Sequence, residues 1–281
     1  MIAAVLWLVL VASTSLTGVQ GAGGTFVEQG TTLSGTSTLL SPACCSHVTI
    51  DSVHVTSGAG LILNLTAVAE AARRNRSTAV TILVKDTTVD GNAELWIVGN
   101  NGIVGSVCYW LVAVNITVIN LKVQNGLFAV SGLSLIGDGG GVDAAFVIIN
   151  SLFQRTDDRL LSTTNVRWGP SGSAVPSVLS LGSSPGQRVT TAVLFTNLYL
   201  FGATTSLTVS GCDFQCSGTT STIVGSLTYA CAGMLLANSK STVDSTISDA
   251  ARMSIAGGNT FTTSHPKYEP VGMLLLTFML R

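Results

Sequence analysis

The stretch Val114–Phe153, VNITVINLKVQNGLFAVSGLSLIGDGGGVDAAFVIINSLF, decides the fold of this 281-residue chain. Between Val114 and Val118, β-branched hydrophobic residues alternate with Asn115 and Thr117. Alternation with a period of two gives a strand one apolar face and one polar face. The stretch therefore begins with a short, half-buried strand.

The alternation then changes phase, because Ile119, Leu121 and Val123 form the next apolar set. Such a shift is expected where an extended chain bends sharply and starts a new strand. Asn125-Gly126 follows, a dipeptide suited to positive φ. Further glycines, including the run Gly139–Gly141, interrupt the later segments at similar short intervals.

Short strands, sharp bends and little helical periodicity predict a chain that winds around one axis and buries one side at every pass. The expected fold is all-β, a right-handed parallel β-helix (a solenoid) similar to that of pectate lyases. A β-sandwich is the alternative, which the lack of clean antiparallel hairpins weakens.

The composition agrees with such a fold. The net charge is −1, only 10% of residues are charged and 47% are hydrophobic. A nucleic-acid-binding protein needs a basic footprint, and a disordered chain needs low hydrophobicity, so both classes are excluded. The apolar runs are about 5–8 residues long, whereas a membrane span needs about 20.

The N-terminus is typical of a secretory signal peptide over residues 1–21. Ile2–Leu10 is a compact apolar run, and the small residues Gly18, Gly21 and Ala22 lie near a possible cleavage site. The start lacks Lys and Arg, so a buried strand or helix start is the alternative. We expect entry into the secretory pathway and a location at the cell surface or outside the cell.

Residues 22–270 are expected to form one β-helix domain. Gln154–Arg188 is richer in charged residues and proline, which predicts a long loop or insertion at 154–188. Ala67–Arg76 has helical character. Residues 271–281 form a short apolar tail, interpreted as a last core strand, a lipid-anchor signal or the end of a truncated reading frame.

A degenerate motif recurs in which a small polar residue is followed within about three positions by a large apolar residue, as solenoid repeats would show. The instances are Ile149–Phe153, Thr196–Tyr199, Gly211–Phe214 and Gly258–Phe261. We expect Asn in stacked turns to bond the backbone of neighbouring coils while the aromatic residues stack in the core. The alternative is that such motifs recur in any β protein.

The N-terminal MIAAVLWLVLVASTSLTGVQGAGGTFVEQG resembles the start of the dispersed-gene-family surface proteins of trypanosomatid parasites. The later VTI-type strands and the segment GCDFQCSG, residues 211–218, are similar to that family as well. The resemblance implies parallel β-helix repeats on a secreted or membrane-attached protein with a role in host contact or adhesion. This chain departs from the family in being short, without a long repeat array or several membrane spans.

Six cysteines behind a signal sequence favour disulfides, and six allow 15 pairings. They are Cys44, Cys45, Cys108, Cys212, Cys216 and Cys231. Cys212–Cys216 is the most local candidate pair, with Cys231 as its competitor. Buried free thiols are an equal alternative. A zinc site is disfavoured because no histidine lies near Cys212 or Cys216, and we expect no metal or cofactor.

Three sequons predict N-glycosylation at Asn64, Asn75 and Asn115. Asn115 shares the polar face of its strand with Thr117, so a glycan there would leave the core undisturbed. Asn75 lies in a polar segment, whereas Asn64 lies beside apolar residues.

Candidate catalytic residues are few. Asp157 and Asp158 are the best local carboxylate pair for glycoside hydrolysis, although they are expected to be loop charges. The Gly-His-Gly of polygalacturonases is absent. His47, Thr49 and Asp51 would share an outward face, but no third member of a catalytic triad can be placed beside them.

We therefore expect a non-catalytic secreted or cell-surface protein for adhesion or host interaction, with host extracellular matrix or carbohydrate as its partner. Membrane attachment is an alternative to secretion. A polysaccharide lyase or glycoside hydrolase on the same fold is the first alternative function, and a truncated, non-functional copy is the second.

Overall fold

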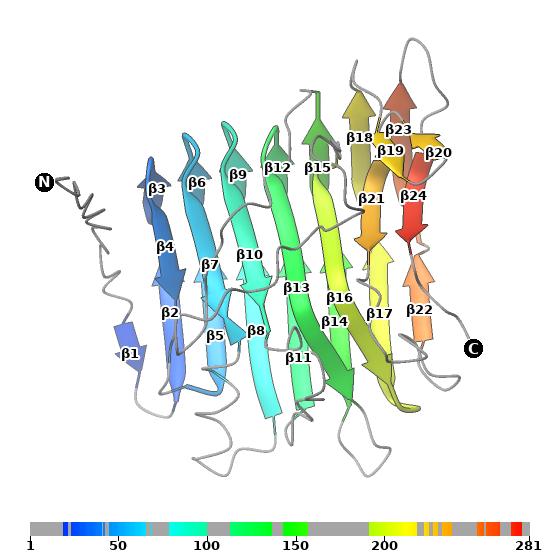
Figure 1. Cartoon of the computed structure of the whole chain (residues 1–281). Helices are drawn as coiled ribbons and strands as arrows, with labels where there is room; N and C mark the ends of the chain where they lie inside the picture. The colour runs from blue at the N-terminus through cyan, green and yellow to red at the C-terminus, as the bar shows by residue number, and fades with distance from the viewer. Residues whose placement is uncertain are drawn as a thin grey trace, which may run out of the picture.

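A computed structural model of the chain shows a stack of β-strands (Figure 1). The structure describes residues 19–21, 24–40, 42, 45–65, 68, 79–99, 113–136, 143–156, 191–217, 222–224, 227–229, 232–237, 252–255, 257–264 and 271–276.

Three sheets make up the fold. Sheet 1 contains, in spatial order, β1 (Val19–Gly21), β2 (Thr25–Gln29), β5 (His47–Asp51), β8 (Ala79–Lys85), β11 (Ala113–Ile119), β14 (Ala144–Ile149), β17 (Thr205–Ser210) and β22 (Arg252–Ile255). Sheet 2 contains β3 (Thr32–Ser34), β6 (His54–Thr56), β9 (Thr88–Asp90), β12 (Lys122–Gln124), β15 (Leu152–Arg155), β18 (Asp213–Ser217) and β23 (Thr260–Ser264). Sheet 3 contains β4 (Ser37–Leu40), β7 (Gly60–Asn64), β10 (Glu94–Val98), β13 (Leu127–Ile136), β16 (Val193–Phe201), β21 (Ala232–Ala237) and β24 (Val271–Leu276).

Each coil contributes one strand to each sheet in turn, and successive coils pair in parallel, from β2–β4 to β22–β24. This is a right-handed parallel β-helix, as predicted, and the β-sandwich is wrong. Two pairings are antiparallel: β1 lies along β2, and β19 (Thr222–Val224) forms a hairpin with β20 (Leu227–Tyr229).

The corner between sheets 1 and 2 explains the change of phase. Asn120 has a φ of 54°, so the chain turns there and Val118 and Leu121 both point into the core. Ile119 is the exception to the prediction, because it is still part of β11 and lies half-buried on the outward face. At Ser52 the same turn places Val53 and Val55 in the same core as Val48 and Ile50, rather than on an opposite face.

Every such corner holds a residue at positive φ, and all but Ser52 are types that tolerate the left-handed region. In chain order they are Gly30, Ser52, Asp86, Asn120, Asn150, Gly211 and, in the last coil, the pair Gly257 and Gly258. The corner therefore has a constant length in the first six coils and one extra residue in the seventh.

Coil length varies, which explains why no repeat length is apparent in the sequence. Thr25 pairs with His47, His47 with Thr81 and Thr81 with Asn115, so these coils are 22, 34 and 34 residues long. Asn115 pairs with Ala145, so the coil that starts at Asn115 is 30 residues long. The later coils are 61 and 46 residues long by the same register.

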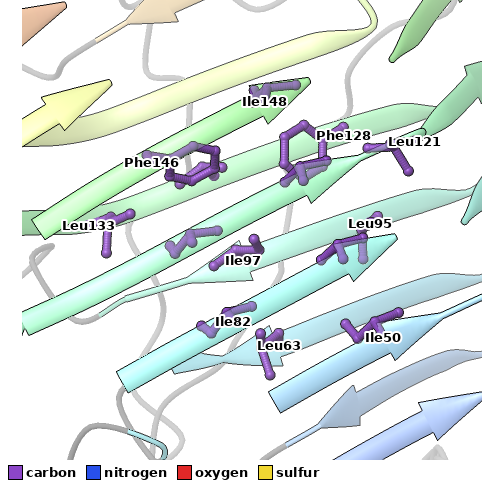
Figure 2. Close-up of a cluster of buried hydrophobic side chains, with 14 of the residues drawn as sticks. Ile50, Leu63, Ile82, Leu95, Ile97, Leu121, Phe128, Leu133, Phe146 and Ile148 are labelled. Atoms are coloured by element: carbon purple, nitrogen blue, oxygen red, sulfur yellow. The ribbon is translucent and has the colours of Figure 1, made fainter. Parts of the chain in front are cut away.

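The inward side chains of the three sheets form one continuous apolar core, part of which Figure 2 shows. Ile82 and Phe146 from sheet 1 face Leu63, Ile97 and other side chains from sheet 3. Aromatic rings stack along the axis at the sheet 2 wall: the ring centroids of Phe153 and Phe214 are 5.2 Å apart, and those of Phe214 and Phe261 are 4.7 Å apart. The expected aromatic stack is confirmed.

The structure refines the expected domain boundaries. Gln154 and Arg155 belong to β15, so they are not part of the insertion, and residues 157–190 lie outside the described residues. Residues 271–276 form β24 beside β21, so this part of the apolar tail is a last strand of the solenoid. Of the expected helix Ala67–Arg76, only Val68 is described, and it is helical and buried.

Candidate binding face

The outward side chains of sheet 2 form a flat polar surface, which we call the polar face. Its inward neighbours, such as Val89, Val123 and Phe214, lie in the core, so the residues between them point outward. The polar face consists of Thr32, Ser34, His54, Thr56, Thr88, Asp90, Lys122, Gln124, Leu152, Gln154, Asp213, Gln215, Ser217, Thr260, Thr262 and Ser264.

A ladder of amides runs along the polar face across three coils. Gln124 Nε2 donates to Gln154 Oε1 at 3.2 Å, and Gln154 Nε2 donates to Gln215 Oε1 at 3.0 Å. Gln215 Nε2 donates in turn to Asp213 Oδ2 at 2.5 Å. All donors point the same way, so the bonds polarise one another and hold the amides in fixed orientations.

An acid–histidine pair lies one coil before the ladder. Asp90, which is in register with Gln124, has its Oδ2 2.8 Å from His54 Nε2, and its Oδ1 accepts the Thr56 hydroxyl. The Thr56 hydrogen bond, with smaller contributions from His54 and Lys122, lowers the pKa of the Asp90 carboxyl against the opposing effect of burial. Asp90 is therefore ionised at neutral pH and orients both partners.

This cluster differs from a Ser-His-Asp triad. The Thr56 hydroxyl bonds Asp90 rather than His54, so no nucleophile is activated by the imidazole within the part of the chain that the structure describes. His47, Thr49 and Asp51 share the outward face of β5, as expected, but they do not form a catalytic pair: His47 Nδ1 lies 3.0 Å from Ser46 Oγ, whereas Asp51 binds Lys85 Nζ at 3.0 Å. The bond from Lys85, with a second from Ser52, lowers the pKa of Asp51.

The predicted glycosylation sites lie in different places. Asn115 is half-buried on the outward face of sheet 1, as expected, and its Oδ1 accepts the Ala145 amide at 3.1 Å. Asn64 ends β7 and is half-buried. Asn75 lies outside the described residues, as do the candidate catalytic residues Asp157 and Asp158.

The three described cysteines divide into two classes, and Cys44, Cys108 and Cys231 lie outside the described residues. Cys45 and Cys216 are disulfide-bonded, and neither partner is among the described residues. Cys212 is a buried free thiol, so the candidate pair Cys212–Cys216 is wrong and the alternative of a buried thiol holds for Cys212. Cys212 occupies the corner position that Ser151 holds in the preceding coil, and each bonds the carbonyl two residues earlier. Burial raises the pKa of the Cys212 thiol, which keeps it protonated.

Three of the four repeated motifs lie at corners. Asn259 confirms the expected bonding, since its Oδ1 accepts the Cys212 amide at 2.9 Å and its Nδ2 donates to the Val209 carbonyl at 2.8 Å. Thr196–Tyr199 does not form a turn, because its backbone continues within β16.

Sequence reasoning missed the polar face. A signal for the ladder is present in the sequence, because the segments KVQ, LFQ and DFQ each place Gln directly after the inward core residue of a sheet 2 strand. The His54–Asp90 pair joins residues 36 positions apart, so it becomes visible only once the coil length is known.

Comparison of the chain with known protein families, curated proteins and solved structures found no match. Within the described ranges, no helix is long and apolar enough to cross a membrane. Among the same residues, no three His, Cys, Asp or Glu side chains group together as metal ligands would.

Proposed function

We propose that the chain is a secreted or cell-surface adhesion protein whose polar face binds carbohydrate of the host extracellular matrix. The amide ladder of Gln124, Gln154 and Gln215 carries this proposal. Each amide offers both a donor and an acceptor, which suits sugar hydroxyls. Coils repeat about every 4.8 Å, so the ladder presents these groups in a regular row to an extended polymer.

The charges of the polar face favour a neutral or weakly acidic glycan. Its described charged groups are Asp90, Lys122 and Asp213, together with the titratable His54. Strongly sulfated glycans select a basic surface, and one lysine beside two carboxylates does not provide it. The apolar N-terminal run and the resemblance to parasite surface proteins support an extracellular setting.

The same geometry supports binding over cleavage. Asp90 and Asp213 lie three coils apart and two positions out of register along the strands, a separation of more than about 14 Å at this repeat. Paired carboxylates of glycoside hydrolases lie roughly 5–9.5 Å apart. Each of these two carboxylates is also held by neighbouring side chains.

The test is binding of the purified chain to immobilised polylactosamine and hyaluronan, with heparin as the sulfated comparison. Gln154→Arg should reduce binding at least tenfold, because it breaks the ladder at its centre. Thr208→Arg, an outward substitution of the same size on sheet 1, should leave binding unchanged. Equal binding by both variants, or no binding by the unaltered chain, would reject the proposal. Release of shortened sugars would instead favour the polysaccharide-cleaving alternative.

A further inference from the structure

Four outward side chains in the middle of the polar face form a rectangle, which we call the central tile. Lys122 is in register with Leu152, and Gln124 is in register with Gln154. Neighbouring strands lie about 4.8 Å apart, and alternate residues of one strand lie about 6.6 Å apart. The central tile therefore has an area close to that of one pyranose ring.

The central tile combines an apolar contact with hydrogen-bonding groups. Leu152 is half-buried, so part of its side chain is exposed to the carbon-bound hydrogens of a sugar ring that lies on it. Gln124 and Gln154 are joined by a hydrogen bond, which fixes the directions of their amide groups. An amide donates and accepts, so these two side chains suit the hydroxyls at the edge of the ring.

The fourth member of the central tile, Lys122, supplies a positive charge. It is exposed, and neither of the two ion pairs found among the described residues includes it. The Asp90 carboxylate lies one coil earlier, where it is bonded by His54 and Thr56 on the strand beyond it. The Lys122 ammonium is therefore accessible to an anionic group of a ligand on the central tile.

On the other side of Leu152, the polar face has the opposite charge. Leu152 is in register with Asp213, and Gln154 is in register with Gln215. The Asp213 carboxylate accepts hydrogen bonds from Gln215 and Thr260, and its charge would repel an acidic group. A ligand carboxylate is therefore favoured on the Lys122 side of Leu152 and disfavoured on the Asp213 side.

We propose that the central tile is a subsite for one hexuronic acid unit of a glycan, with the carboxylate of that unit bound to Lys122. This inference rests on the proposed carbohydrate binding by the polar face, and it narrows the ligand to glycans that contain uronic acid. The ring lies on Leu152, its hydroxyls bond Gln124 and Gln154, and its carboxylate accepts a hydrogen bond from Lys122 Nζ. One lysine matches the single carboxylate of a uronic acid.

The test compares hyaluronan with its carboxyl-reduced derivative, in which a primary alcohol replaces each carboxylate. The unaltered chain should bind hyaluronan about tenfold more tightly, because a hydrogen bond between charged groups is stronger than one to a neutral group. Lys122→Gln should abolish this preference and leave binding of the carboxyl-reduced polymer unchanged. Arg252→Gln removes one positive charge from the outward face of sheet 1, so the preference should persist in this control.

A variant with the opposite effect sharpens the test. Asp213→Asn keeps the size of the side chain but removes its charge, so hyaluronan should bind about threefold more tightly. Equal binding of the two polymers by the unaltered chain, or an unchanged preference in Lys122→Gln, would overturn the subsite and leave the proposed function standing. If the unaltered chain bound neither polymer, the proposed function itself would be rejected, and the subsite with it.

Discussion

Sheets 2 and 3 share the same coils and the same core, yet their outward faces are opposite in character. On sheet 2 the outward residues are polar and partly exposed, as Gln124, Gln154 and Gln215 are. On sheet 3 the outward residues Trp96, Leu194 and Leu235 are buried although they are not members of the inward core. The coil geometry therefore determines which side chains point into the core. The residue types at the outward positions determine whether a sheet faces solvent or apolar side chains.

The largest expected effect on stability comes from placing the same charged side chain on each of these two outward faces. Leu194→Arg places a charge on the buried face of sheet 3 and should lower the free energy of unfolding by about 4 kcal/mol. Gln154→Arg places the same charge on the polar face and should change that free energy by less than about 0.5 kcal/mol. Denaturant unfolding of the two variants checks this. Equal losses would show that the two faces do not differ in burial.

In the core that both sheets share, the stability lost on truncating a side chain should increase with the burial of that side chain. Phe214→Ala should cost about 4 kcal/mol, because the ring is fully buried between Phe153 and Phe261. Phe261→Ala should cost less than half of that, since Phe261 is 38% exposed. Thermal unfolding of the pair measures the ratio, and similar losses would contradict the difference in burial between the two rings.

A smaller effect is expected at the turn that joins the polar face to sheet 3. A Cβ on Gly126 would lie 2.9 Å from the Val89 carbonyl and 3.0 Å from the Ala93 carbonyl. Gly126→Ala should therefore cost about 2 kcal/mol by overpacking. Gln124→Ala, at the end of β12 just before this turn, should cost far less, and a harmless Gly126→Ala would refute the close packing of these coils.

The smallest effect concerns acid stability. The pKa of Asp90 is lowered in the folded chain, so unfolding takes up a proton as the pH falls. The stability that Asp90 supplies is complete above its unfolded pKa of about 3.9 and is lost as the pH falls through the lower folded value. Between pH 5 and pH 3, Asp90→Asn should consequently lose less stability than the unaltered chain. A greater loss in the variant would contradict the direction of the shift.

Much of the architecture could be predicted from local pattern. The phase change at Asn120 and the stacked ring of Phe214 depend on residues adjacent in sequence, so the sequence alone indicates them. Coil length could not be predicted, because segments of different length follow sheet 3 and, in the two longest coils, sheet 2 as well. The turn predicted around Asn197 is absent for a related reason. Its residue types resemble those of a corner, but they lie in the middle of the nine-residue strand β16.

The candidate site was harder to predict than the fold. His54 and Asp90 meet only because their coils are in register, and the three glutamines of the ladder are 30 and 61 positions apart. The candidate disulfide was wrong because distance along the sequence is a poor guide to distance in space in a solenoid. Cys212 and Cys216 are close along the chain, but Cys212 serves the corner while Cys216 is disulfide-bonded.

The most direct test of the central claim is hydroxyl-radical footprinting of the chain with and without polylactosamine. Oxidation of Leu152 and His54, both on the polar face, should fall when the glycan is present. Leu83 and Ile119, which lie half-buried on the outward face of sheet 1, should be oxidised equally in both samples. Unchanged oxidation of Leu152, or protection of Leu83 and Ile119 instead, would contradict carbohydrate binding by the polar face.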